Sequence, residues 1–464
     1  MLFHSIVFLS VFLPVVFAAY TLVRGQRNKN ILLIIANLVF YAYGQAVYVA
    51  LLFASAVFHY FIGRVVTGKL KKIWLIVCVI ADVLVLFLFK YLAFAVDILN
   101  KAAGTSFTAL RLAMPVGISF FTFQALSYVI DAYRDPEQSE RNFGDVLLYI
   151  TLFPQLLAGP IIRFKDIKAE IRSRETSWDD VADGIRRFIL GLSKKVILAD
   201  TVAKVANGVF ALSAGDLNVM SAWLGAIAYT LQIYFDFSGY SDMAIGLAEV
   251  FGFHYKENFH FPYAAIGIKD FWRRWHISLS SWFRDYLYIP LGGNRKGKKR
   301  TVLNKFIVFF VTGLWHGANW TFIVWGLAHG TCAVIEDGLR SKFPAGRGIV
   351  WKRVLTMVIV ITTFAIFRAD SLGQAFLFIG KMFAGFSVSA ASRAAVVRLM
   401  TPFTIFACAL AVLFSFPILE KSWRIENKSA GARVLWNAAA LFLFLFSMAM
   451  ISSGGYSPFI YFKF

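Results

Sequence analysis

The stretch that decides the fold class is FIVFFVTGLWHGANWTFIVWGLAHGTCAVI, residues 306–335, which contains no Asp, Glu, Lys or Arg. Lys305 marks one aqueous end of the stretch, and His316 lies near its middle. At about 1.5 Å per residue, a helix from Lys305 to His316 covers roughly 16 Å, about half of a ~30 Å hydrocarbon core. A titratable side chain at that depth is costly, so its presence indicates a function. Glycines on both sides of His316 allow a substrate or another backbone to approach closely.

The composition of the whole chain matches this stretch. Of its 464 residues, 59% are hydrophobic and only 16% are charged, and the mean hydropathy of +0.67 exceeds that of ordinary soluble domains. We therefore expect an all-α polytopic membrane protein with about ten to twelve transmembrane helices, plus re-entrant or interfacial helices. Because no low-complexity linker or repeat interrupts the chain, we expect one integral-membrane domain, residues 1–464, with a motif-bearing core at about 115–335.

The net charge of +21 has a membrane explanation. Lys and Arg gather in short segments between the apolar runs, such as Arg24–Lys29 and Arg295–Arg300. This distribution is typical of cytoplasmic loops and of contact with anionic lipid headgroups, so membrane lipid is an expected partner and nucleic acid is not. The three cysteines are far apart, and no HExxH, CxxC, P-loop or dinucleotide-binding pattern is present. We expect no metal site and no bound cofactor.

Two local patterns predict helix boundaries. Ser177-Trp178-Asp179-Asp180 resembles a capping box and predicts a helix start. Ala158-Gly159-Pro160 interrupts the apolar run 143–162, which is therefore expected to dip into the membrane without crossing it.

His316 is the first candidate for chemistry. Burial keeps an imidazole neutral, and a neutral imidazole can take the proton of a hydroxyl that attacks an acyl carbonyl. The alternative is a histidine that bonds a backbone carbonyl. On a continuous helix His329 is rotated by about 220° from His316, so the two share a face only if the helix breaks, for example at Gly317.

His276 lies in a second candidate segment, residues 269–286, which is too charged to span a membrane simply. If this segment is one helix, Trp272, Arg273 and Arg284 lie on the same side as His276. The pattern predicts an interfacial or funnel-lining helix whose arginines hold phosphate or carboxylate groups. Anchoring to lipid headgroups is the alternative.

Asp236 and Asp242 flank the third candidate segment, Phe-Ser-Gly-Tyr-Ser. Carboxylates inside membrane segments face a cavity or pair with a cation. Here the expected cations are Arg273, Arg274 or Arg284, although an aspartate can also orient an imidazole. The expected substrate-path residues are, in full, Asp236, Ser238, Asp242, Trp272, Arg273, Arg284, Asp285, Asn319 and His329.

The same segments carry a family resemblance. FDFSGYSDMAIGLAEVFGF (235–253), FWRRWHISLSSWFRDYLYIPLGGNR (271–295) and GLWHGANWTFIVWGLAHG (313–330) resemble the membrane-bound O-acyltransferase family, and within it the bacterial alginate O-acetylase branch. The resemblance covers most of residues 1–370. It implies that His316 is the catalytic histidine and His276 the second family histidine, and that the helices surround a central funnel.

The resemblance also implies a function. The expected activity moves an acyl group, with acetyl favoured, from a cytoplasmic thioester such as acetyl-CoA to a hydroxyl of an extracytoplasmic polysaccharide. The acceptor class is alginate-like exopolysaccharide, cellulose or peptidoglycan, reached directly or through an esterase-like partner outside a bacterial inner membrane. D-alanyl transfer to teichoic acid is an alternative, disfavoured by the LYIPLGGNR block. A multi-span transporter is another, disfavoured because the polar residues cluster in one third of the chain.

Overall fold

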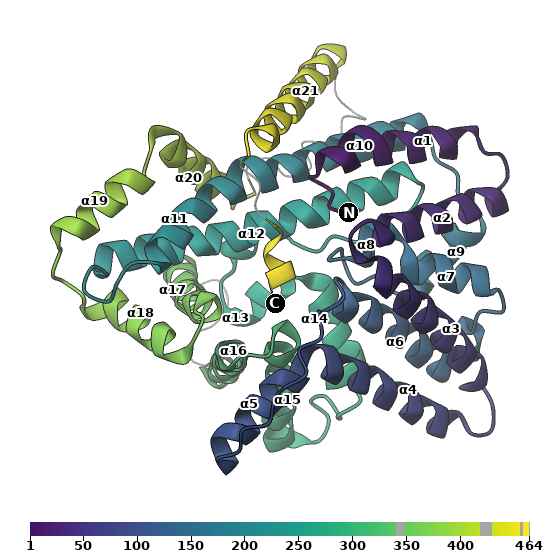
Figure 1. The fold of residues 1–464 in the computed structure, drawn as a ribbon, viewed down its shortest axis with the longest axis horizontal. Coiled ribbons are helices and arrows are strands. Elements are labelled where there is room, and N and C mark those ends of the chain that lie inside the picture. The colour runs from purple at the N-terminus through teal and green to yellow at the C-terminus, as the bar shows by residue number, and fades with distance from the viewer. Residues whose placement is uncertain (340–347, 418–428, 455–457, 464) are drawn as a thin grey trace. The chain divides into compact units, whose positions relative to one another are not determined.

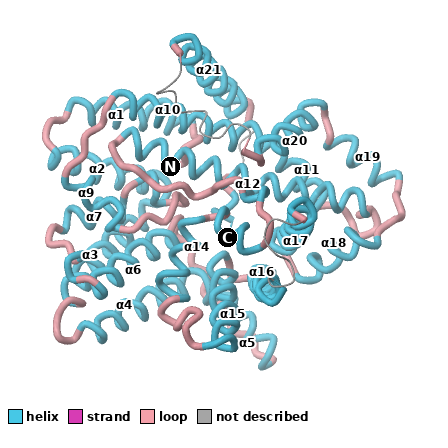
Figure 2. Tube along the Cα trace, turned by 180° about the vertical axis from the view of Figure 1, so that it is seen from behind, coloured by secondary structure: helices cyan, strands magenta, loops and turns pink. Residues whose placement is uncertain are grey.

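The computed structural model describes residues 1–339, 348–417, 429–454 and 458–463, and throughout these ranges the chain is helix and loop without a strand (Figure 2). The all-helical prediction is confirmed for this part of the chain. By its internal packing the chain divides into two compact units. The first is formed by Met1–Ile189 and Tyr240–Lys256, and the second by Leu190–Gly239 and Glu257–Phe464.

The first unit is built from the N-terminal helices (Figure 1). They are α1 (Leu13–Leu22), α2 (Gln26–Gln45), α3 (Val49–Val65), α4 (Lys71–Leu86), α5 (Leu92–Ala103), α6 (Ile118–Arg134), α7 (Phe143–Thr151), α8 (Phe153–Leu156), α9 (Phe164–Arg172) and most of α10 (Trp178–Ser193). Helix α6 is buried along most of its length and packs against α3 and α4. A cluster of phenylalanine rings, including Phe8, Phe40 and Phe153, fills the space between α2, α8 and the N-terminal segment.

The second unit holds the remaining helices and the candidate residues at the centre of the sequence analysis. Its elements are α11 (Asp200–Phe210), α12 (Val219–Val250, which continues into the first unit), α13 (Ile268–Arg274), α14 (Ile277–Phe283), α15 (Gly297–His316), α16 (Trp320–Leu339), α17 (Ile349–Arg368), α18 (Leu372–Ala384), α19 (Ala390–Leu399), α20 (Pro402–Phe414), α21 (Ala430–Ser452) and the short 3-10 segment η8 (Ile460–Lys463).

The stretch 306–335 is a hairpin of two helices, so of the two possibilities that the sequence left open, a continuous helix or a break near Gly317, the structure has the break. Helix α15 ends at His316, α16 begins at Trp320, and the two lie side by side in both views (Figures 1 and 2). The turn is possible because glycines remove side chains where the two backbones meet. A Cβ atom added at Gly313 would fall against the carbonyl oxygen of Phe322, and one added at Gly326 against that of Phe309.

Fewer helices meet the criteria for crossing a membrane than the expected ten to twelve. Among the described residues, four helical segments are long and apolar enough, or five if one bent pair is a single span. The four are Gln26–Val65, Lys71–Ala103, Ile349–Arg368 and Ala430–Ser452, and the bent pair is Ala390–Leu399 with Pro402–Phe414. Other apolar runs fall short because they are divided between short helices, as in 143–162, or begin with basic residues, as in α15.

Two smaller expectations about helix boundaries can be compared with the structure. The capping box is confirmed, because the Ser177 hydroxyl donates to the Asp180 carboxylate at 2.7 Å and the Asp180 N–H donates back to Ser177 Oγ at 3.1 Å. The run 143–162 is broken as expected, but the helix first stops earlier, at Leu152, between α7 and α8.

Close packing at Gly326 predicts that two glycine-to-alanine substitutions in α16 differ in their effect on the melting temperature. We expect Gly326→Ala to lower the melting temperature in detergent, because the added methyl group pushes α16 away from Phe309; overpacking of this kind costs about 1–3 kcal/mol. Gly338→Ala is the matched control, since nothing lies within 4 Å of its added Cβ. Equal melting temperatures for the two variants in a thermal-shift assay would contradict close backbone packing at Gly326.

Candidate active site

His316 ends α15 inside an aromatic enclosure. Its side chain is buried, with a relative exposure of 3%. Four aromatic ring centroids surround the imidazole: Trp315 at 5.0 Å, Trp325 at 5.1 Å, Phe367 at 5.2 Å and Tyr461 at 5.7 Å. Such surroundings exclude water and place a titratable ring among apolar surfaces, as expected for a base that must stay neutral.

His276 lies at a break between α13 and α14, so the single helix expected over 269–286 is wrong. His276 adopts a left-handed backbone conformation with φ of 44°. Asn258 makes the break possible by accepting the N–H of Ile277 on its backbone oxygen at 2.9 Å and the N–H of Ser278 on its Oδ1 at 3.1 Å. A left-handed residue that is not glycine is strained, and such strain is often found at functional sites.

The hydrogen bonds around His276 determine which of its ring nitrogens carries the proton. Asn258 Oδ1 accepts the Ser278 N–H and lies 3.2 Å from Nδ1 of His276. Because this oxygen only accepts, Nδ1 carries the hydrogen and Nε2 carries the lone pair. Nε2 is buried and has no hydrogen-bond partner among the described residues. His276 is therefore held in the tautomer that can accept a proton at Nε2.

Tyr461, near the C-terminus, brings the two histidines into one site. Its ring centroid lies 5.7 Å from that of His316 and 6.3 Å from that of His276. Its neighbour Ile460 donates its N–H to Asp236 at 2.7 Å, which fixes the end of the chain against α12. Sequence reasoning missed Tyr461. The available signal was the aromatic sequence Phe459-Ile460-Tyr461-Phe462 after the last apolar helix.

The two aspartates are paired, but not with the arginines expected from the sequence. Asp236 is buried and accepts an ion pair from Lys195 at 2.7 Å, and the same ammonium group pairs with Asp200 at 2.7 Å. Asp242 belongs to the first unit, where it pairs with Arg187 at 3.0 Å. Ser238 is buried near Asp236 on α12. These ion pairs neutralise charged side chains that are buried among the packed helices, so their role is structural.

His329 has a hydrogen-bond partner on each ring nitrogen. Trp272 donates its indole N–H to His329 Nδ1 at 3.2 Å, so Nε2 carries the hydrogen and donates to Thr363 Oγ1 at 3.0 Å. The Thr363 hydroxyl in turn donates to the carbonyl of Val360 at 3.0 Å. His316 and His329 lie on different helices, because the chain breaks after His316. This hydrogen-bond chain gives His329 and Trp272 a structural role.

The arginines of the second candidate segment lie on the surface of their unit. Arg273 and Arg284 are exposed. Arg284 contacts Asp285 through two hydrogen bonds, of 2.7 and 3.2 Å. A solvated pair of adjacent residues contributes little to stability. The structure therefore does not bring these side chains to His316.

A cavity of about 440 Å³ lies next to the aromatic enclosure of His316. Phe367 lines this cavity and also contacts the His316 ring, so a single aromatic layer separates the two. The lining residues are Asn207, Tyr229, Gln232, Gly317, Ala318, Asn319, Phe322, Phe367, Arg368, Ala369, Asp370 and Ile460. Of the expected substrate-path residues, Asn319 lines the cavity; it donates to the carbonyl of Asp370 at 3.1 Å. Polar groups and an arginine make this cavity suitable for a hydroxyl-rich ligand.

Charge is distributed unequally along the α15–α16 hairpin. Lys305 and Lys269 both pair with Asp337, which lies near the end of α16. Lys298 to Arg300 are exposed at the start of α15. This basic end is separated from His316 by the length of α15, about 30 Å for a helix of this size. The cavity lies at the opposite end of the helix from the basic residues.

Comparison with known proteins identifies the family of the chain. The family model of MBOAT, the membrane-bound O-acyltransferase family, matches residues 121–372. The chain is 41% identical to the probable alginate O-acetylase AlgI of Pseudomonas putida, with 100% of both chains covered.

Two less similar relatives match smaller shares of the chain. The peptidoglycan O-acetyltransferase of Helicobacter pylori is 35% identical over 81% of this chain and 78% of that protein. The teichoic acid D-alanyltransferase of Streptococcus thermophilus is 31% identical over 56% of this chain and 65% of its own. The chain therefore belongs to the membrane-bound O-acyltransferase family, and its activity is the transfer of an acyl group.

Proposed function

We propose that this protein lies in a bacterial cytoplasmic membrane and moves an acetyl group from a cytoplasmic thioester, such as acetyl-CoA, to a hydroxyl of an extracytoplasmic polysaccharide. The observation that carries the proposal is the position of His316, one aromatic layer from a polar cavity and one helix length from a basic surface. The relatives that match the full chain are alginate O-acetylases, which makes alginate-like exopolysaccharide the favoured acceptor.

The basic end of the hairpin supports the assignment of the donor side. Loops rich in Lys and Arg between membrane segments usually lie on the cytoplasmic side of the membrane. Lys298, Lys299 and Arg300 are exposed at the start of α15. Lys352 and Arg353 lie at the start of α17, which runs antiparallel to α16 and ends at Arg368 beside the cavity. An anionic nucleotide thioester would bind the basic end, and the cavity would receive the acceptor from the opposite side.

His316 is the proposed general base. As the acceptor hydroxyl attacks the thioester carbonyl, the imidazole takes the hydroxyl proton, and the new C–O bond forms while the C–S bond breaks. The proton then passes to the departing thiolate, so the histidine returns to its neutral form. General-base assistance of this kind contributes about 10²–10⁴-fold to the rate. The aromatic enclosure excludes water, which would otherwise compete as the acceptor.

His276 has a proposed supporting role in the same enclosure. Its Nε2 lone pair accepts a hydrogen bond or a proton from the substrate, while Asn258 holds Nδ1–H in place. Tyr461 fills the space between the two imidazoles and keeps them at fixed separation. By positioning the two imidazoles, Tyr461 can have a large effect on the rate without itself taking part in the chemistry.

The acceptor can be reached in two ways. In one, the polysaccharide hydroxyl enters the cavity itself; in the other, an extracytoplasmic esterase-like partner receives the acetyl group first and passes it on. Arg368 and Asp370 at the cavity suit either a carbohydrate or a protein side chain. D-alanyl transfer is the second candidate function, and the 31% identity to a teichoic acid D-alanyltransferase supports it over little more than half of the chain.

The first prediction separates catalysis from structure with two histidine variants. We expect His316→Ala to reduce acetyl transfer from radiolabelled acetyl-CoA by about 10²–10⁴-fold, because the variant lacks the general base. The yield of purified protein should stay near that of the wild type. His329→Ala is the control: it removes the acceptor of the Trp272 indole N–H, so it should lower the melting temperature more than it lowers activity per folded molecule. Retention of most activity in the His316 variant would remove that residue from the mechanism.

A second prediction concerns the C-terminal ring. Tyr461→Ala should reduce acetyl transfer more than tenfold, a change of about 1.4 kcal/mol in the barrier, because both imidazoles lose the surface that holds them. Tyr461→Phe should stay near the wild-type rate, since the ring is retained. The rate is measured on monodisperse protein in detergent. Equal activity of the Ala and Phe variants would show that the ring does not position the histidines.

The third prediction tests the orientation of the hairpin. Asn319→Cys, at the cavity, should react with a membrane-impermeant maleimide added to intact cells, whereas Lys299→Cys should react only after the cells are opened. The unmodified chain is the control, because its three cysteines are buried or half-buried within helices. The reverse pattern of labelling would place the cavity on the cytoplasmic side and overturn the proposed direction of transfer.

A further inference from the structure

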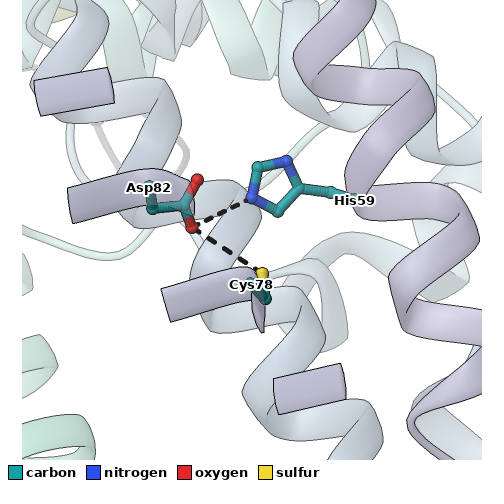
Figure 3. A group of neighbouring side chains, drawn as sticks. All are labelled: His59, Cys78 and Asp82. Carbon is teal, nitrogen blue, oxygen red and sulfur yellow. Dashed lines mark hydrogen bonds and ion pairs between the residues drawn. The ribbon is translucent and has the colours of Figure 1, made fainter. Parts of the chain in front are cut away.

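Three side chains of different chemical types converge in the first unit, between α3 and α4. His59 Nε2 lies 3.1 Å from Asp82 Oδ2, and Cys78 Sγ lies 3.8 Å from the same oxygen. One ligand atom from each of the three residues lies within 4.8 Å of the other two, and all three residues are buried. Figure 3 shows that one oxygen of the Asp82 carboxylate contacts both the imidazole of His59 and the thiol of Cys78.

Two residues of this cluster form the buried face of α4. Cys78 and Asp82 are the only buried residues of α4, and they lie one helical turn apart on the same side. The apolar side chains of α4 are exposed instead, among them Ile73, Ile76, Ile80 and Val83. In a membrane, the hydrophobic effect does not drive apolar helix faces together, because lipid is equally apolar; close packing and polar contacts between helices do so instead. The polar pair therefore contributes to the attachment of α4 at this face, together with the packing of α4 against α3 and α6.

The hydrogen bonds of His59 leave a lone pair facing the carboxylate. Nδ1 of His59 lies 2.8 Å from the carbonyl oxygen of Ser55, which can only accept, so Nδ1 carries the hydrogen. In the neutral imidazole Nε2 then presents its lone pair to Asp82. Two electron-rich atoms at 3.1 Å need a cation between them, which is either a proton or a metal ion.

We propose that His59, Cys78 and Asp82 bind a divalent ion of the zinc class, which joins α3 to α4. Imidazole, thiolate and carboxylate are all ligands of tetrahedral zinc, with metal–ligand bonds of about 2.0–2.3 Å. The separations of 3.1 Å from His59 to Asp82 and 3.8 Å from Cys78 to Asp82 are close to the edges of such a tetrahedron, and all three ligand atoms lie within 4.8 Å of one another. The Nδ1–H bond to the Ser55 carbonyl is the outer contact that orients a metal-bound histidine. Three protein ligands leave one position for water.

Charge balance favours the same occupant. One divalent cation, one thiolate, one carboxylate and one neutral imidazole sum to zero, which suits a buried site where net charge is costly. Binding exchanges the metal ion for two protons, the one on the thiol and the one shared by His59 and Asp82, and both leave to the solvent. The expectation of no metal site arose because the ligands come from two helices without a recognised sequence spacing.

Cobalt titration tests the site directly. Full-length protein without a histidine tag is purified in detergent, treated with chelator, and titrated with Co²⁺. We expect binding of about one ion per chain, with a thiolate-to-cobalt charge-transfer band that Zn²⁺ abolishes by displacement. Added Zn²⁺ should also raise the melting temperature, and excess chelator should reverse the rise.

Single substitutions decide between a metal site and a simple hydrogen-bonded pair. Cys78→Ser should lose the charge-transfer band, while the matched Cys408→Ser variant, changed in α20, should keep it. Asp82→Asn should lose the stabilisation by Zn²⁺. The proposal is overturned if the wild type shows no charge-transfer band, or if Cys78→Ser keeps the band. It is also overturned if Zn²⁺ leaves the melting temperature of the wild type unchanged.

Discussion

The site depends on the contact between α15 and α16 at their glycines. Gly313 and Gly326 each occupy a position where an added methyl group would meet a backbone carbonyl of the facing helix. This close approach lets the chain reverse direction within Gly317–Asn319 while both helices stay packed. His316 is therefore held at the tip of a rigid hairpin, and a rigid support is what a base needs to meet its substrate reproducibly.

The rest of the site is assembled around that tip from parts far apart in the sequence. The break at His276 places a second imidazole at the same aromatic enclosure, and the ring of Tyr461 contacts both imidazoles. A buried ion pair supports this arrangement, because Asp236 accepts the backbone N–H of Ile460 while Lys195 balances its charge. Loss of that pair would release the C-terminal segment as well as leave a buried charge.

Sequence reasoning identified the helical membrane class, the acyltransferase resemblance and the segments that carry the histidines. It did so because apolar runs and aromatic-basic blocks are local properties of the chain. It did not identify the break at His276 and only left open the break after His316, since these depend on Asn258 and on helix-to-helix contacts. The partners of Asp236 and the position of Tyr461 were missed for the same reason: ion pairs and ring contacts join residues that no spacing rule connects.

The central claim is that a donor and an acceptor reach His316 from opposite sides of a membrane. The most direct measurement uses sealed proteoliposomes of known orientation, with radiolabelled acetyl-CoA on one side and alginate on the other. The account predicts labelled polymer only when acetyl-CoA is on the side of the basic loop 295–300 and alginate, with any required partner, is on the side of the cavity. Transfer that requires both substrates on one side, or acetyl-CoA on the cavity side, would contradict it.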